Sequence, residues 1–215
     1  MKKSKHPQSQ ALGMFVCDII QCMEYFTAKT FALPELKGIS TKNIEEHLKL
    51  YAGYVKFSNY IQNQITELSK DAEKNIYELG ELSRRFAFEH DGMRNHEKFF
   101  TQFEGGAQAI SDSPLKAKIE KEYGSFETFL ARFKTLAMTR GVGWAMLYDC
   151  SESGHLLMQW VDEQHIGHLT GVKLILALDM WEHAFVYDFP TSEKKKYVEA
   201  FFENLNWSVV EKRFQ

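Results

Sequence analysis

An aspartate and a histidine stand four residues apart at the end of an apolar run, in the segment DMWEHA that begins at Asp179 and includes His183. The run over residues 174–178 predicts a short buried strand, so both side chains can face one point beyond its end. A carboxylate oxygen and an imidazole nitrogen together suit a divalent or trivalent first-row metal. Alone, the pair is equally consistent with a capping aspartate beside a buried core histidine.

Two more histidines lie in segments that predict helices. His47 stands among apolar residues that recur every three or four positions over 40–69. His96 belongs to a second helical segment over 71–103, in which a break near Asp91 and Gly92 is one alternative. Taken singly, each histidine is more often a satisfied core residue than a metal ligand. A metal site therefore needs a pattern that unites all four residues.

The elements that must position these residues are helical, then extended, then helical again. Because helices and strands are segregated along the chain, the pattern favours an α+β fold over a doubly wound sheet. A hairpin loop is expected at 151–154, between the first two strands. The remaining helices are predicted from 113, over 126–139 and over 193–213 with a cap at Asn206, and the strands over 144–149, 155–161 and 174–178.

Composition excludes several classes of protein. The 215 residues are 44% hydrophobic and 26% charged, which is typical of a globular chain, and the net charge of −3 argues against a nucleic-acid partner. No apolar run reaches the roughly 18 residues of a membrane span. Three cysteines cannot form a disulfide framework and favour a reducing, cytoplasmic location. The basic start and apolar stretch near the N-terminus resemble a signal peptide faintly, so export is the lesser alternative.

Taken together, the chemistry-bearing segments resemble the iron/manganese superoxide dismutase family, from about residue 33 to the C-terminus. The segment ending at His47 resembles the family's opening helix, and Asn95-His96 with the following Phe99-Phe100 resembles its second ligand segment. DMWEHA resembles the family's most diagnostic motif, Asp-x-Trp-Glu-His-Ala. Two further segments resemble family motifs, GVGW ending at Trp144 and the Asn-Trp pair at 206–207.

The resemblance implies an N-terminal helical-hairpin domain over 33–108 and a C-terminal α/β domain over 109–215 with a small three-stranded antiparallel sheet. Residues 1–32 would be an N-terminal extension, with an ordered, a disordered and a cleaved segment as alternatives. One manganese or iron ion would lie between the domains and would convert superoxide to oxygen and hydrogen peroxide. Its implied ligands are His47, His96, Asp179 and His183.

The resemblance also assigns residues around the metal. Gly92 stands where one branch of the family has a glutamine, so Gln164 resembles the sheet-borne glutamine of the manganese branch, with its neighbour His165 as competitor. This arrangement favours manganese over iron. Trp144 and Trp181 would wall the metal. Glu182 resembles the residue that crosses a homodimer interface to the partner's last histidine ligand.

Three positions depart from the family pattern. Tyr51 replaces a histidine four residues after the first ligand, and Val55 replaces a tyrosine that guards substrate access. Tyr54 lies one residue earlier, and seven residues at about 100° each return to within about 20° of the face of His47, so Tyr54 either takes this role or merely packs. Val186 replaces a further tyrosine, with Tyr187 next to it.

These departures keep a second function open. A protein of this fold could bind the metal without fast turnover and serve as a metal store or a scaffold. An iron oxygenase site is a weaker third alternative, because it would use one imidazole fewer. Attraction of an anionic substrate would need a local basic rim, since the net charge is negative. Lys49 and Arg94 are the candidates for it, against a simpler interpretation as solvated surface.

Overall fold

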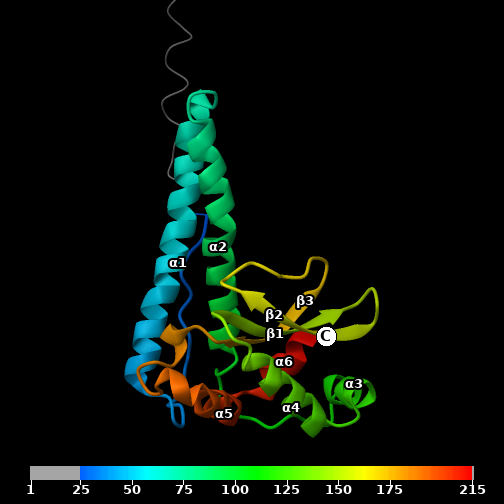
Figure 1. Cartoon of the computed structure of the whole chain (residues 1–215). Coiled ribbons are helices and arrows are strands. Elements are labelled where there is room, and N and C mark those ends of the chain that lie inside the picture. The colour runs from blue at the N-terminus through cyan, green and yellow to red at the C-terminus, as the bar shows by residue number, and fades with distance from the viewer. Residues whose placement is uncertain (1–24, 215) are drawn as a thin grey trace, which may run out of the picture.

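Two long helices pack against each other as a hairpin that stands away from the rest of the molecule (Figure 1). The computed structural model describes residues 25–214. Helix α1 spans Thr41–Leu68, and the hydroxyl of Ser40 caps it by accepting a hydrogen bond from the backbone N–H of Asn43. A single 3-10 turn, η1 (Ser69–Asp71), leads to helix α2, Ile76–Thr101. The two predicted helices are therefore confirmed.

Helix α2 starts later than predicted, and of the two alternatives for its course the unbroken helix is observed. It begins at Ile76 rather than near residue 71, and it continues unbroken through Asp91 and Gly92. The absence of a side chain at Gly92 makes room for the ring of Tyr54 from α1, because a Cβ atom there would lie 2.6 Å from the Cδ1 atom of Tyr54. The glycine thus serves the packing of the two helices and does not end α2.

The described part of the predicted N-terminal extension lies along the hairpin. Asn59 of α1 holds Phe26 at both backbone groups, with N···O distances of 2.9 and 2.7 Å. The ring of Phe31 packs against the rings of Tyr51 and Phe100, with centroids 5.4 and 5.1 Å apart. Residues 25–32 therefore belong with the hairpin by contact, whereas the predicted signal-like stretch, Cys17 and Cys22 lie outside the described residues.

The second half is a three-stranded antiparallel sheet covered by short helices. The strand order is β2-β1-β3, and a β-bulge at Leu147/Tyr148 shifts the register between β1 and β3. This sheet confirms the predicted strands and the α+β class. Its elements are β1 (Gly143–Cys150), β2 (His155–Asp162) and β3 (Lys173–Asp179), with helices α3 (Pro114–Tyr123), α4 (Phe126–Ala137), α5 (Lys194–Asn204) and α6 (Trp207–Phe214).

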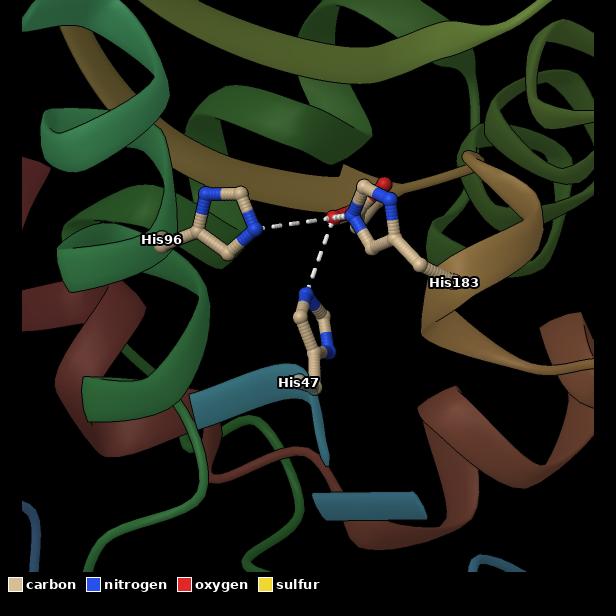
Figure 2. Close-up of side chains that lie close together, drawn as sticks. His47, His96 and His183 are labelled. Atoms are coloured by element: carbon tan, nitrogen blue, oxygen red, sulfur yellow. Dashed lines mark hydrogen bonds and ion pairs between the residues drawn. The ribbon is translucent and has the colours of Figure 1, made fainter. Parts of the chain in front are cut away.

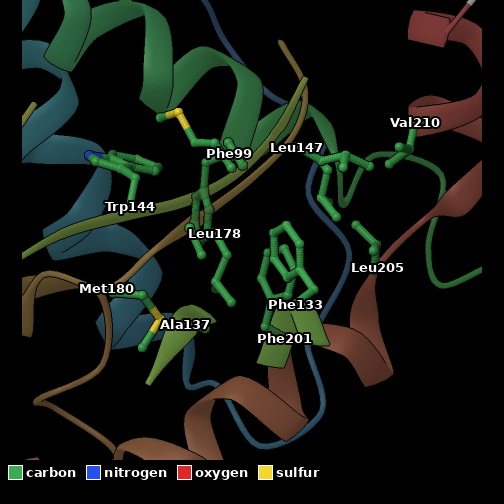
Figure 3. Close-up of a cluster of buried hydrophobic side chains, with 14 of the residues drawn as sticks. Phe99, Phe133, Ala137, Trp144, Leu147, Leu178, Met180, Phe201, Leu205 and Val210 are labelled. Atoms are coloured by element: carbon green, nitrogen blue, oxygen red, sulfur yellow. The ribbon is translucent and has the colours of Figure 1, made fainter. Parts of the chain in front are cut away.

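One hydrophobic core joins the two halves. Phe99 of α2 stacks on Phe201 of α5 with ring centroids 5.9 Å apart, beside Trp144 of β1 and Leu178 of β3 (Figure 3). Gln102, directly after α2, adds a buried polar connection, because its side chain exchanges two hydrogen bonds with the backbone of Ala177 in β3. The C-terminal end of α2 is thereby fixed to the sheet, next to the end of β3 where Asp179 lies.

Candidate metal centre

Four side chains from the two halves converge on one buried point. Oδ2 of Asp179 lies 3.1 Å from Nε2 of His47, 3.2 Å from Nε2 of His183 and 3.5 Å from Nε2 of His96 (Figure 2). One possible ligand atom from each residue lies within 4.8 Å of the others. The structure therefore brings together all four residues that the sequence singled out, from positions up to 136 residues apart in the chain.

The hairpin directs its two histidines by helical geometry. His47 is on the buried face of α1, where rings of Phe99 and Phe100 lie 5.1 and 4.9 Å from its own. Nδ1 of His96 donates to the carbonyl oxygen of Gly92, 2.6 Å away, one turn earlier in α2. Since a carbonyl only accepts, the proton is on Nδ1, and Nε2 presents its lone pair to the centre.

The sheet half supplies the other two residues from a strand end and a turn. Asp179 is the last residue of β3, and its Oδ1 accepts the backbone N–H of Trp181 at 2.9 Å. This contact begins the tight turn into η2 (Glu182–Ala184), which carries His183. The second carboxylate oxygen is thereby left to face the three imidazoles.

The donor set fits a divalent or trivalent cation. Nε2 of His96 is fully buried and has no hydrogen-bond partner among the described residues. Burial lowers the pKa of His47, and burial together with the charge of His47 lowers that of His96 to about 3. For Asp179 burial acts upward, but the charge and hydrogen bonds of His183 and His47 outweigh it and hold the pKa low. Burial thus favours the neutral forms of His47 and His96 beside an ionised Asp179, and neutral imidazole and carboxylate are the forms that bind a metal.

Gln164 lies beside the four residues and links three elements. Its Oε1 accepts from the indole N–H of Trp144 at 2.9 Å, and its Nε2 donates to the hydroxyl of Tyr54 at 2.9 Å. Asn95 of α2 holds the backbone carbonyl of Gln164 at 2.8 Å. The ring of the neighbouring His165 instead lies 5.8 Å from that of Phe88. Of the two competing residues, only Gln164 makes these contacts.

The aromatic residues around the site take different places. Trp144 meets the ring of His96 edge-on at 5.1 Å, and Trp181 stacks on His183 at 5.6 Å. The ring of Tyr54 lies 5.0 Å from that of His96. Tyr51 instead bonds to Glu97 and to the backbone N–H of Lys29, at 3.3 and 2.8 Å. Its ring also contacts that of Phe100, which in turn contacts His47.

The turn around His183 carries exposed side chains. Glu182 is exposed, and Val186 and Tyr187 are about half exposed. Sequence reasoning missed Phe88, whose ring touches those of Tyr54 and Trp181. Phe88 precedes Gly92 by one helical turn, so the spacing of three or four residues along α2 was the signal that could have found it.

Comparisons with known proteins agree with this geometry. The sequence profile of the iron/manganese superoxide dismutase C-terminal domain matches residues 111–213. The chain is 33% identical to a superoxide dismutase [Fe] of Aquifex pyrophilus, over 84% of this chain and 86% of that protein. A superoxide dismutase [Fe] of Cupriavidus metallidurans is also 33% identical, over 84% and 90%.

A more distant relative carries a different metal in its name. The superoxide dismutase [Mn], mitochondrial, of Glossina morsitans morsitans is 29% identical, over 83% of each chain. The similarity to these proteins covers more than four fifths of this chain. The chain therefore belongs to the iron/manganese superoxide dismutase family.

Proposed function

We propose that this protein is a superoxide dismutase that holds one manganese or iron ion with His47, His96, Asp179 and His183. The observation that carries the proposal is the convergence of three imidazole nitrogens and one carboxylate oxygen within 4.8 Å. Two superoxide ions and two protons would give one molecule of oxygen and one of hydrogen peroxide. The bound metal supplies the change of oxidation state that this reaction needs.

The chain's own contribution is to hold the ligands and to supply hydrogen bonds and protons. Asp179 offsets part of the cation's charge, and the three histidines bind through neutral nitrogens. Tyr54 accepts its hydrogen bond from Gln164, so its own O–H remains free to donate. Burial raises the pKa of this hydroxyl, and the charge of Asp179 raises it further, so Tyr54 keeps its proton at neutral pH.

Manganese is the proposed metal on the strength of one feature, the pairing of Gly92 with Gln164. Several relatives are named for iron, and one is named for manganese. Residues that hydrogen-bond around a metal site tune its potential, whereas the four ligands do not discriminate between these metals. The preference for manganese or iron therefore depends on how Gln164, held by Trp144 and Tyr54, tunes the reduction potential of each bound metal.

A homodimer and a cytoplasmic location complete the proposal. Exposed Glu182, Val186 and Tyr187 form a surface beside His183, which supports an interface through this turn. The helices within residues 25–214 lack the combination of length and hydrophobicity that a bilayer crossing requires. Molecular mass in solution tests the dimer, and Glu182→Ala is the variant expected to weaken it.

The deciding experiment loads the purified protein separately with manganese and with iron. Superoxide decay is followed by pulse radiolysis and normalised to bound metal. Turnover near the diffusional ceiling of about 10⁸–10⁹ M⁻¹s⁻¹ with one metal supports the enzyme and identifies that metal. Stoichiometric binding with no turnover from either metal contradicts the proposal and leaves a metal store or scaffold.

A further inference from the structure

The metal centre comes closest to solvent on one side. Among its four residues the side chain of His183 is 19% exposed, while the others are 0–1% exposed. Trp181 stacks on His183, and Phe88 of α2 contacts both Trp181 and Tyr54, with ring centroids 6.4 and 6.0 Å away. Phe88 therefore forms an aromatic cover over Trp181 and Tyr54, beside His183, the most exposed of the four residues.

A charged pair lies on this cover. The guanidinium carbon of Arg85 is 3.7 Å from the ring centroid of Phe88. Nη2 of Arg85 lies 2.7 Å from Oε1 of Glu89, one helical turn later. The side chain of Arg85 is 50% exposed and that of Glu89 only 9%. The cation thus faces solvent, while its carboxylate partner is nearly buried beside the site.

The two cations suggested by the sequence have other places. Lys49 pairs with Glu46 on the exposed face of α1. Arg94 pairs with Glu97 and lies over the ring of Phe26, against the N-terminal segment. Arg85 instead lies over the ring of Phe88, which contacts Tyr54. Its positive charge is therefore close enough to the site to attract an anionic substrate.

We propose that Arg85, held on Phe88 by Glu89, attracts the anionic substrate to the metal site and offsets the charge of Glu89 there. This inference rests on the proposed dismutase function. Geometry connects the pair to the site, because Phe88, which carries Arg85, contacts Tyr54, and the ring of Tyr54 lies 5.0 Å from that of His96. Arg85 acts as a positioning residue, since it guides the anion and touches no ligand of the metal.

The test uses the metal-loaded full chain and four variants. Arg85→Gln removes the cation and leaves Glu89 unpaired, Arg85→Lys keeps the charge, and Glu89→Gln removes the carboxylate. Arg94→Gln is the matched control, because Arg94 also pairs with a nearly buried glutamate on α2 but faces away from Phe88. Two quantities are measured at low and high ionic strength: kcat/KM for superoxide and the affinity for azide by optical titration.

We expect Arg85→Gln to lower kcat/KM and azide affinity about two- to fivefold at an ionic strength near ~0.01 M. The difference should shrink near ~0.15 M, where the Debye length falls to about 8 Å. Glu89→Gln should shift both quantities in the opposite direction, which misfolding would not produce. Arg85→Lys should stay close to the unmodified protein.

Two results would overturn the inference. One is an unchanged salt dependence of azide affinity in Arg85→Gln, and the other is an effect of Arg94→Gln as large as that of Arg85→Gln. Failure of the dismutase proposal looks different, because the unmodified metal-loaded protein would then bind azide but not turn over superoxide. The azide titration still decides the role of Arg85 in that case.

Discussion

The two halves of the molecule each provide two residues to the centre, but they hold them differently. In the hairpin, His47 and His96 project from the interiors of helices 28 and 26 residues long, so regular backbone bonding fixes their direction. In the sheet half, Asp179 and His183 lie at a strand end and in a turn of three residues. The hairpin depends on helical periodicity, whereas the sheet half depends on local contacts around Asp179.

This difference also appears away from the centre. Ile76 and Tyr77, at the start of α2, are each 75% exposed, whereas β1 and β3 are largely buried. Substitutions at the far end of the hairpin should therefore be mild, and substitutions at the end of β3 should be severe. The following predictions test that contrast in order of decreasing expected effect.

Asp179→Ala should have the largest effect, because it removes the only carboxylate among the four converging residues and the atom that faces all three imidazoles. Loss of a residue that merely supports a ligand costs about 10–100-fold in affinity or activity, so loss of Asp179 should exceed that range. Metal content per chain and superoxide decay measure the result. Asp149→Ala, in β1, is the control and should retain the metal.

If Asp179→Ala keeps the metal, the three histidines are enough to bind it. The expected dependence of metal binding on the end of β3 would then be wrong. His96→Ala provides the reciprocal test from the hairpin. If both variants lose the metal but remain folded, as judged by circular dichroism, the two halves contribute jointly to the site.

Gly92→Ala should have the next largest effect and starts from the contact between the two helices of the hairpin. A Cβ at Gly92 would lie 2.6–3.0 Å from three ring atoms of Tyr54, so the ring must move away from Gln164. We expect activity per bound metal to fall about tenfold, at the lower end of the range for losing a contact that supports a metal site. Tyr54→Phe should reproduce most of this fall without a steric clash. If Gly92→Ala lowers thermal stability but leaves activity per bound metal unchanged, the proposed role of the Tyr54 position in activity is contradicted.

The same glycine shows what the sequence could and could not predict. Local periodicity was enough to place His47 on the apolar face of a helix and Asp179 at a strand end, whereas their union with His183 in one metal site was expected only from the family resemblance. The rotation of Tyr54 onto the face of His47 was predictable for the same reason. The uninterrupted course of α2 through Gly92 was not, because it depends on the space that Tyr54 occupies from the other helix.

Two other features depended on contacts between distant segments. Tyr51 stands where the family has a histidine, and its hydroxyl bonds to Lys29 and Glu97, which requires residues 25–32 to lie along the hairpin. The position of Arg85 depends on Phe88, Tyr54 and Trp181 meeting from separate elements. Sequence patterns define faces of single elements, whereas these contacts arise only when the elements pack.

A smaller effect concerns acid stability in the sheet half. Burial lowers the pKa of His168, opposed by the charge of Asp91, and Nδ1 of His168 shares a hydrogen bond with the hydroxyl of Tyr148 at 2.6 Å. The unfolded chain therefore takes up a proton near pH 6.5, while the folded protein does not. Stability should be fully present above that pH and should decrease as the pH falls below it.

His168→Gln should flatten this decrease relative to the unmodified protein. The contribution of one such group is at most about 1.4 kcal/mol per pH unit, and less here because His168 is partly exposed to solvent. The free energy of unfolding of both proteins is measured in urea between pH 7 and 5. The difference between the two values removes any effect of metal loss in acid that both proteins share. A constant difference across this range would show that His168 does not contribute to the acid sensitivity.

Gly80→Ala should have the smallest effect and the opposite sign. Gly80 lies in the exposed part of α2, and a Cβ there would meet nothing within 4 Å, in contrast to Gly92 twelve residues later in the same helix. Alanine restricts the unfolded chain and favours helix, so the free energy of unfolding should rise by about 0.4–1 kcal/mol with unchanged activity. Denaturant unfolding measures the free energy of unfolding, and superoxide decay measures the activity. Destabilisation by Gly80→Ala would mean that the far end of the hairpin is constrained by contacts like those at Gly92, and the contrast between the two regions of α2 would be lost.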